Sequence, residues 1–435
     1  MLKRKAADEI KKWLDSKNKK CLIIQGARQT GKTYIIERFA EENYEELVEI
    51  NFKQLPSARD IFAGDLTVDN MVMAMRFRFP EKKILPGKTM IFLDEIQECQ
   101  EALTSLKFWA IDNRFDVIAS GSLLGIDYKR ASSYPVGYVD YVRMYGLDFE
   151  EFLWGMGISK DMTGKLCDYL HSRTVIPEAI HSQMMNYYRQ YIATGGMPEA
   201  VQKYADTKDF REVDRIQRNL LQGYLYDIAH YATAEEKVKA EKCYLSLAKQ
   251  LLDKENHKFQ YKEVEHGGRA QKYFSSVEWL LRADMVHLCK LVTDIRFDLD
   301  DYARDDFFRA YTTDLSLLMA MKDFSLKQYI VENTLEGNSK GGIYECAIAD
   351  ALYKKGYPLY FYKNETAKKE IDVIIQKEGK VIPIEVKSGN TRASSLRSLM
   401  KNHKDIGCGY KFADGNTGVS EDRIITLPLY MAAFL

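Results

Sequence analysis

Residues 26–33 read GARQTGKT and fit the spacing G-x-x-x-x-G-K-[ST]. The two glycines let the backbone curl so that successive N–H groups point at phosphate oxygens. Lys32 would reach the β- and γ-phosphates, and the Thr33 hydroxyl would bind Mg²⁺. The motif lies between a strand-like run, Cys21–Gln25, and a helical run, Tyr34–Ala40, as this chemistry requires. The predicted ligands are therefore ATP or a related nucleotide and Mg²⁺, and the predicted phosphate-binding residues are Gly26, Ala27, Arg28, Gln29, Thr30, Gly31, Lys32 and Thr33.

Two carboxylates follow a buried strand further along the chain. Thr89–Leu93 is apolar or neutral and ends in Asp94-Glu95, which resembles a Walker B motif. Ligands of open α/β sheets bind at the carboxyl edge of the strands. Asp94 would hold Mg²⁺ together with Thr33, and Glu95 would activate the attacking water. The alternative is an ordinary acidic loop, or for the glycine-rich segment a plain strand–turn–helix with a surface lysine.

A third strand-like run, Phe115–Ser120, ends in Ser120-Gly121-Ser122. Ser120 or Ser122 could sense the γ-phosphate at this edge. Serine and glycine also favour turns, so both interpretations stay open.

The first third of the chain alternates strand-like with helical runs, which predicts a mostly parallel sheet covered by helices. Residues 182–204 and 210–230 have helical periodicity. The expected strands are Cys21–Gln25, Leu47–Asn51, Thr89–Leu93, Phe115–Ser120 and Tyr138–Tyr145.

Residues 235–330 have the element order of a winged helix, three helices followed by a β-ribbon. The predicted recognition helix is Gln271–Ala283, and the predicted strands are Met285–Val292 and Phe307–Thr313. The helix entry carries residues that can contact phosphates, but the loop Asp294–Asp306 is rich in aspartate and would repel DNA. A protein-binding or structural winged helix is the alternative. The helix-entry residues are Arg269, Lys272, Tyr273, Ser275 and Ser276.

Two alternating runs near the C-terminus predict a β-hairpin that turns at Glu378-Gly379. If Lys377 pairs with Lys380, then Asp372 lies opposite Glu385, and Glu370 lies opposite Lys387. Opposed carboxylates repel unless a metal neutralises them. Asp372, Glu385 and Lys387 fit the restriction-endonuclease-like pattern, a second candidate metal site that Glu345 would join. A Glu370–Lys387 ion pair beside solvated carboxylates is the alternative.

Composition excludes little. The 435 residues carry 63 basic and 63 acidic side chains, so any nucleic-acid partner would need a local basic patch. The seven cysteines are dispersed without a CxxC pair, which argues against zinc and disulfide frameworks. The charged N-terminus and short apolar runs indicate a cytoplasmic protein with no membrane partner.

Several longer strings resemble the AAA-type ATPases of bacteria and archaea that carry a trailing domain of unknown function, relatives of STAND-like ATPases. Besides the P-loop, the matching strings are IFLDEIQ (91–97), ASGSLLG (119–125), SSYPVG (132–137), YGLDFEEFL (145–153), YIATGGMPEAV (191–201), FRAYTTDLSLL (308–318), EIDVII (370–375) and IEVKSG (384–389).

The resemblance implies an α/β multidomain protein: an AAA-like core over residues 1–155, a helical region over 156–234, a winged helix over 235–330 and a restriction-endonuclease-like domain over 331–435. Such ATPases commonly receive an arginine finger from a neighbouring subunit. Arg130 is the candidate here, with Lys129 and Arg114 as alternatives, and a homo-oligomer is implied.

Three hypotheses about function follow. The first is a Mg²⁺-dependent ATPase that works as a switch on nucleic acid or a protein partner. The second is a nucleotide-regulated nuclease that uses the C-terminal carboxylates. The third is a scaffold that binds nucleotide with little turnover.

Overall fold

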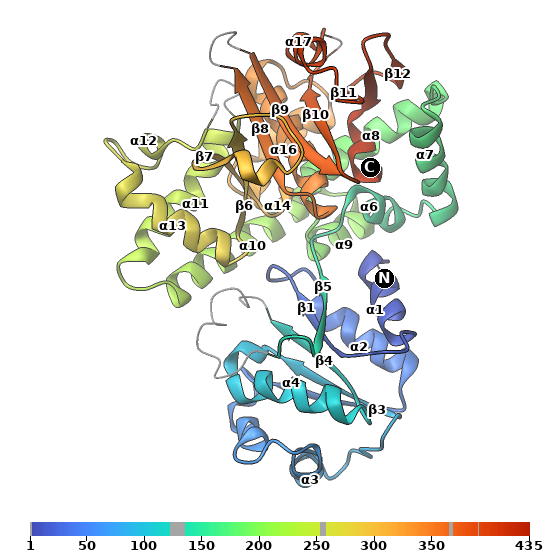
Figure 1. Cartoon of the computed structure of the whole chain (residues 1–435), viewed down its shortest axis with the longest axis vertical. Helices are drawn as coiled ribbons and strands as arrows, with labels where there is room; N and C mark the ends of the chain where they lie inside the picture. The colour runs from blue at the N-terminus through green and yellow to red at the C-terminus, as the bar shows by residue number, and fades with distance from the viewer. Residues whose placement is uncertain (1, 122–134, 253–257, 365–368, 390) are drawn as a thin grey trace. The chain divides into compact units, whose positions relative to one another are not determined.

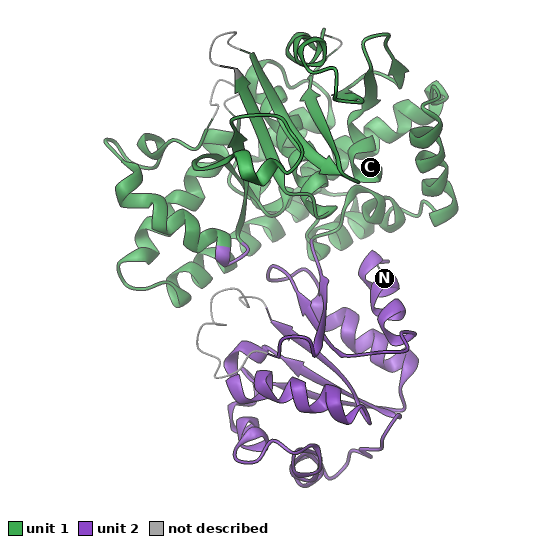
Figure 2. Ribbon diagram, viewed as in Figure 1, with its two compact units in different colours: residues 1–2, 146–281, 285–435 green, residues 3–145, 282–284 purple. Residues whose placement is uncertain are grey.

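The chain forms two compact units, shown in different colours in Figure 2. The computed structural model describes residues 2–121, 135–252, 258–364, 369–389 and 391–435. The N-terminal unit holds residues 3–145 with 282–284. The C-terminal unit holds residues 146–281 and 285–435, together with the start of the chain.

The N-terminal unit is built on a parallel sheet, with strand order β2-β3-β4-β1-β5 in the described part of the chain (Figure 1). All five predicted strands are present, with ends displaced by at most two residues. β1 lies between β4 and β5, so the loop that follows β1 is flanked by the ends of two other strands. The strands are β1 (Cys21–Gln25), β2 (Glu46–Asn51), β3 (Thr89–Asp94), β4 (Asp116–Gly121) and β5 (Val139–Arg143).

Helices cover both faces of this sheet, because alternate strand residues point to opposite sides. Cys21 and Ile23 belong to one buried cluster, and Leu22 and Ile24 belong to the other. The first cluster includes residues of η1 (Pro56–Phe62), α3 (Val68–Arg78), η2 (Ile96–Glu98) and α4 (Gln100–Asp112). The second includes residues of α1 (Lys5–Leu14) and α2 (Lys32–Asn43).

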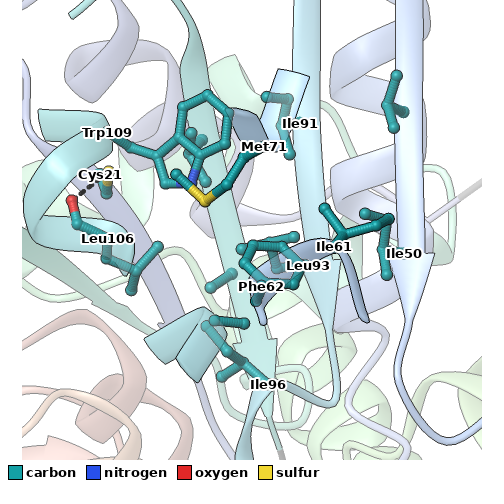
Figure 3. Packing of buried hydrophobic residues seen from close by; sticks show 14 of the residues in the cluster. Cys21, Ile50, Ile61, Phe62, Met71, Ile91, Leu93, Ile96, Leu106 and Trp109 are labelled. Atoms are coloured by element: carbon teal, nitrogen blue, oxygen red, sulfur yellow. Dashed lines mark hydrogen bonds between the residues drawn. The ribbon is translucent and has the colours of Figure 1, made fainter. Parts of the chain in front are cut away.

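Figure 3 shows the first cluster, where Trp109 of α4 packs beside Met71 of α3. The buried Cys21 thiol donates to the Leu106 carbonyl oxygen at 3.3 Å. Burial raises the pKa of this thiol far above its usual range, so the cysteine serves as a core residue.

The C-terminal unit begins with helices. These are α6 (Phe149–Gly155), α7 (Lys160–Ser172), α8 (Glu178–Thr194), α9 (Pro198–Thr207), α10 (Phe210–Tyr231), α11 (Glu236–Leu252), α12 (Tyr261–Val264) and α13 (Ala270–Arg282), the last of which ends where the chain returns to the N-terminal unit.

The periodic stretch over 182–204 forms two helices, because α8 ends at Thr194 and α9 begins at Pro198. Gly195 between them has φ 71° and ψ −167°, a conformation that is essentially restricted to glycine. A Cβ atom there would lie 2.1 Å from the backbone nitrogen of Ser316. The helix therefore stops where the chain passes closely against residue 316.

A second sheet carries the strands of the C-terminal unit, in the order β12-β13-β11-β10-β9-β8-β6-β7 for the described residues (Figure 1). Its strands are β6 (Val286–Val292), β7 (Ala303–Thr312), β8 (Leu359–Asn364), β9 (Lys369–Lys377), β10 (Lys380–Val386), β11 (Gly409–Ala413), β12 (Gly418–Val419) and β13 (Ile424–Pro428). The remaining elements are η4 (Leu299–Tyr302), α14 (Leu315–Ala320), α15 (Phe324–Val331), α16 (Gly337–Lys354), α17 (Ser394–Asn402) and η5 (Leu429–Phe434).

The two strands predicted as the wing of a winged helix are part of this sheet. β6 pairs antiparallel with β7 and parallel with β8. Residues on both sides of the predicted boundary at 330/331 therefore share one sheet. The predicted acidic loop 294–306 is shorter than expected, because residues 299–302 form η4 and β7 begins at Ala303. A winged helix and a restriction-endonuclease-like domain stay predictions.

A buried polar cluster joins several strings that the sequence singled out. The Lys354 ammonium lies 2.7 Å from Asp314 and 2.9 Å from Asp350, and it donates to the Leu147 carbonyl oxygen at 3.2 Å. The other carboxylate oxygen of Asp314 accepts the Gly196 N–H at 2.8 Å. Segments near residues 147, 196 and 314 therefore meet in the core, where an unpaired charge would be costly.

Among the described residues, each helix is too short or too polar to cross a membrane.

Candidate functional site

The GARQTGKT segment forms a compact loop between β1 and α2. Gln29 and Gly31 adopt positive φ values of 61° and 90°. Gly26 has φ 155°, and a Cβ atom at this position would lie 2.0 Å from the Met144 carbonyl oxygen. The glycine is therefore required by the close approach of the segment that follows β5. The Thr30 hydroxyl donates to the Ala27 carbonyl oxygen at 3.0 Å and holds the loop closed.

Lys32 begins α2 and its side chain lies back across the loop. Its ammonium donates to the carbonyl oxygens of Gly26 at 2.9 Å and Ala27 at 2.8 Å. The residue is only 8% exposed. Burial lowers the pKa of the ammonium to about 8, and the negative charges of Glu95 and Asp94 oppose part of this fall. The loop thus contains a nearly dehydrated cation, which an anion can bind strongly.

Asp94 gathers donors from three other elements at the carboxyl edge of the sheet. One carboxylate oxygen accepts Asn51 of β2 at 2.8 Å and the Thr33 hydroxyl of α2 at 3.3 Å. The other oxygen accepts the buried Ser120 hydroxyl of β4. It also accepts the backbone N–H of Glu95, the next residue, at 3.1 Å. Asn51 is paired with Asp94 in the strand register, and Leu93 is paired with Ala119. Parallel register therefore brings Asn51, Asp94 and Ser120 to one point, and Thr33 reaches it from α2.

Glu95 lies directly beyond the strand, in the left-handed region with φ 51° and ψ 46°. Its carboxylate accepts the Gln97 amide at 2.5 Å. This conformation turns the backbone sharply after Asp94, so that the two neighbouring carboxylates have different partners. Glu95 is partly exposed, whereas Asp94 is buried.

The structure brings most predicted site residues together and identifies two more. Ser120 is at the expected edge, but its hydroxyl is engaged by Asp94. Asn51 was not predicted, although its place at the end of a strand beside β3 was a usable signal. Arg4 was also missed: it donates to the Thr30 carbonyl oxygen of the loop.

The remaining nucleotide-site candidates are Ser122, Lys129, Arg130 and Arg114. Ser122, Lys129 and Arg130 lie outside the described residues. Arg114 precedes β4, at the amino edge of the sheet, where it pairs with Asp112 and Asp69.

Two of the C-terminal carboxylates, Glu345 and Glu370, pair with an arginine that the sequence did not suggest. The predicted hairpin register is confirmed, with Lys380 paired to Lys377 and pairing continuing to Ile384 and Val373. The buried Arg309 of β7 pairs with Glu370 and, at 2.5 Å, with Glu345 of α16. Its guanidinium also donates to the Asp372 carbonyl oxygen at 3.2 Å.

The other two carboxylates bond to the backbone. Asp372 accepts the Val386 N–H at 2.7 Å, and Glu385 accepts the Leu396 N–H of α17 at 2.8 Å. Lys387 pairs with Glu385 at 2.6 Å, and Glu370 pairs with Arg309. In the part of the chain that the structure describes, no group of three acidic, histidine or cysteine side chains could hold a metal ion.

Four polar residues at the start of α13 bond to glutamates of the same unit. Lys272 and the Tyr273 hydroxyl bond to Glu265 at 3.0 and 2.6 Å. Ser275 and Ser276 donate to the two carboxylate oxygens of Glu236 at 2.9 and 2.6 Å. These side chains therefore stabilise the packing of α13 against α11 and the segment after α12.

Residues 18–153 match the family model described as an AAA domain. Together with the parallel sheet and the loop after β1, this makes the N-terminal unit an AAA-type P-loop ATPase domain. Residues 185–328 and 340–431 match two further family models, the domains of unknown function DUF8612 and DUF4143. An AAA domain match is thus followed along the chain by matches to two domains of unknown function.

Three solved structures show a distant likeness. The Orc1 protein of Aeropyrum pernix in complex with DNA is 13% identical, with 76% of this chain and 91% of that chain covered and a TM-score of 0.26. Cdc6p from Pyrobaculum aerophilum is 13% identical, with 77% and 97% covered and a TM-score of 0.27. A STAND protein with a tetratricopeptide repeat sensor from Pyrococcus horikoshii is 12% identical, with 82% and 46% covered and a TM-score of 0.26. These low scores do not establish a shared arrangement of the whole chain. Among curated proteins, no sequence matches.

Proposed function

We propose that the N-terminal unit binds ATP with Mg²⁺ and hydrolyses it, and that the C-terminal unit responds to the nucleotide state. The observation that carries this proposal is the meeting of Thr33 and Asp94, with a hydroxyl-to-carboxylate distance of 3.3 Å, beside the buried ammonium of Lys32. A cation at one end of a glycine-bordered loop and an oxygen pair at the other suit a nucleotide phosphate chain and its metal.

The residues present fit the proposed metal. Mg²⁺ prefers hard oxygen ligands and usually takes only one or two from the protein. Thr33 supplies a hydroxyl, and Asp94 supplies a carboxylate oxygen whose position is held by Asn51 and Ser120. When bound, Mg²⁺ would neutralise charge that develops on the phosphate oxygens.

The side chains have separate tasks in this proposal. Lys32 exchanges the carbonyl oxygens of Gly26 and Ala27 for phosphate oxygens, which bear more negative charge. Asp94 holds the Thr33 hydroxyl in place. Glu95, which is partly exposed, accepts the proton of the attacking water. The Gln97 amide holds the Glu95 carboxylate until water and nucleotide are in place.

Two substitutions test the proposal. Lys32→Ala should abolish ATP binding measured by calorimetry, because the loop loses its cation. Glu95→Gln should bind ATP as tightly as the wild-type protein. Its rate of phosphate release should fall by about 100-fold or more, because the amide cannot accept a proton.

The matched control is Glu98→Gln, which changes an acidic residue three positions further on that pairs with Arg59 away from the loop. It should leave phosphate release unchanged. Wild-type protein that takes up no ATP would reject the nucleotide site altogether. Undiminished release by Glu95→Gln would reject only the role of Glu95.

No observation favours the nuclease hypothesis. Glu345 and Glu370 share the Arg309 guanidinium, and Asp372 and Glu385 accept backbone N–H groups. The internal bonds of Lys272 and its neighbours likewise do not favour a DNA-reading role for α13. A protein partner is therefore the output that we propose for the switch.

A further inference from the structure

Arg4 is a charged residue outside the P-loop motif that contacts the loop directly. One guanidinium nitrogen donates to the Thr30 carbonyl oxygen at 2.8 Å. A second nitrogen of the same group donates to the Tyr145 carbonyl oxygen at 2.6 Å. One planar group therefore connects the phosphate loop to the segment after β5, which leads into the C-terminal unit.

The backbone of Arg4 is held in place by the packing of α1. Arg4 is the residue immediately before α1, and it has extended backbone angles. Ala6, Ile10 and Trp13 of α1 are buried in the same cluster as Ile24 of β1 and Met144. The helix is thus packed on the strand that feeds the loop, so the guanidinium has a defined position relative to both carbonyl groups.

The bond to Thr30 also orients a donor that points the other way. The Thr30–Gly31 peptide is trans, and the C=O and N–H of a trans peptide are directed to opposite sides. Holding the Thr30 oxygen toward Arg4 therefore turns the Gly31 N–H away from Arg4. The N–H groups of such a loop bind phosphate only when they point into its concave side.

The bond to Tyr145 reaches the joint between the two units, which we define as residues 144–147. At its start, the Met144 N–H donates to the Gln25 carbonyl oxygen at 2.7 Å. At its end, the Leu147 N–H donates to the Gly196 carbonyl oxygen at 2.6 Å, and the Leu147 oxygen accepts the Tyr191 hydroxyl at 2.9 Å. The joint is therefore bonded at one end to the strand before the loop and at the other to the core of the C-terminal unit.

We infer that Arg4 is a positioning residue that presents the phosphate loop to the β- and γ-phosphates and links the loop to the joint. This inference rests on the proposed nucleotide site and adds to it a residue outside the motif. Arginine suits the task because its planar fork can hold two carbonyl oxygens in fixed directions, whereas lysine carries a single ammonium.

The affinities of the chain for ATP, ADP and AMP test whether Arg4 positions the phosphate loop. Arg4→Gln should weaken ATP and ADP by about tenfold or more, because a charge-assisted bond that orients the loop is lost, while AMP stays within about twofold. Arg4→Lys should fall between Arg4→Gln and the wild type. Lys3→Gln removes the same charge from the exposed neighbouring residue and should change nothing.

The positioning role would be overturned if Arg4→Gln bound ATP and ADP within about twofold of the wild-type affinities. An equal loss for all three nucleotides would overturn it as well, because that pattern indicates a fold defect. Wild-type protein without any affinity for ATP would reject the nucleotide site itself, which separates the two failures.

Hydrogen exchange tests whether Arg4 links the loop to the joint, residues 144–147. Saturating ATP and Mg²⁺ should slow amide exchange in residues 144–147 of the wild type and of Lys3→Gln, but not of Arg4→Gln at concentrations that saturate this variant. An unchanged wild-type joint, or equal slowing in Arg4→Gln, would overturn the link.

Discussion

At the scale of single residues, Lys32 is a cation that the fold keeps almost dry. Burial destabilises the charged ammonium form of Lys32 relative to the neutral amine, whereas a bound phosphate would stabilise only the ammonium form. The same property makes the residue sensitive to pH. An unburied lysine keeps its proton far above neutral pH, whereas Lys32 loses its proton near pH 8 in the free protein.

We predict that ATP affinity falls as the pH rises above about 8. Phosphate binding favours the ammonium form, so the dissociation constant should rise by about tenfold per pH unit beyond that point. The free fold behaves in the opposite sense. Because the pKa of Lys32 is lowered on folding, the unfolded chain binds more protons between about pH 8 and 10.5, and the contribution of Lys32 to stability increases with pH there.

Calorimetric titrations from about pH 7 to about pH 9.5 measure this effect. Binding near pH 9 should also take up close to one proton, seen as a dependence of the heat on the buffer. Lys32→Arg keeps its charge throughout this range and should bind more weakly but without the pH dependence. A wild-type affinity that stays constant to pH 9.5 contradicts the prediction.

Arg309 is another residue whose charge is buried, and it pairs with two carboxylates. Desolvation raises the pKa of Glu345 and of Glu370, and Arg309 opposes the rise. Arg309→Leu should therefore destabilise the fold by about 3–5 kcal/mol at neutral pH, since two buried carboxylates lose their cation. Their pKa values would rise further, so the deficit should shrink as the pH falls and they become protonated.

Denaturant unfolding at several pH values measures the deficit. Arg304→Leu is the control, because Arg304 lies on the same strand and pairs with the exposed Asp306. It should change the unfolding free energy by less than about 1 kcal/mol. Equal effects of the two substitutions would show that the carboxylates do not depend on Arg309.

At the scale of elements, local patterns were sufficient where the structure depends on neighbours in sequence. The β9–β10 hairpin formed as predicted because Glu378 and Gly379 both take positive φ, 49° and 74°, as a tight two-residue turn requires. Asp94 and Ser120 lie in contact because parallel strands end at one edge. Arg309 could not be predicted, since alternation along β7 does not show which distant strand it faces.

The periodic stretch over 182–204 is divided into two helices for a related reason. Its apolar spacing continues across Gly195-Gly196, and the residue that forbids continuation there is Ser316, more than a hundred positions away. The Gly-Gly pair followed by Met197-Pro198 was the local signal of a break. Such close approaches belong to the tertiary fold, and periodicity alone does not contain them.

Gly195→Ala should therefore destabilise the C-terminal unit by about 3 kcal/mol or more, because it combines a glycine-only conformation with a backbone clash. Gly164→Ala is the matched control. Gly164 lies inside α7 with open space around its Cβ position, so this substitution should stabilise the chain by about 0.5–1 kcal/mol. The thermal midpoints of the two variants should move in opposite directions; a shared direction would contradict the argument.

At the scale of the whole molecule, the chain has two units with separate hydrophobic cores. The two large clusters around the first sheet contain only residues of the N-terminal unit. The cluster around Ile371, Leu396 and Met400 lies within the C-terminal unit. Residues 144–147 connect the units, and the Met144 and Leu147 N–H groups each bond within their own unit.

We predict that calorimetric unfolding of the full chain shows two transitions, because each unit buries its own core. ATP with Mg²⁺ binds only the N-terminal unit in this account, so at 100 times its dissociation constant it should stabilise that unit by about 2.7 kcal/mol and raise one transition by several degrees. The other transition should move much less. Lys32→Ala should abolish the shift, while Gly195→Ala should lower the transition that ATP leaves nearly unchanged. A single transition that shifts as a whole would show instead that the two cores unfold as one cooperative structure.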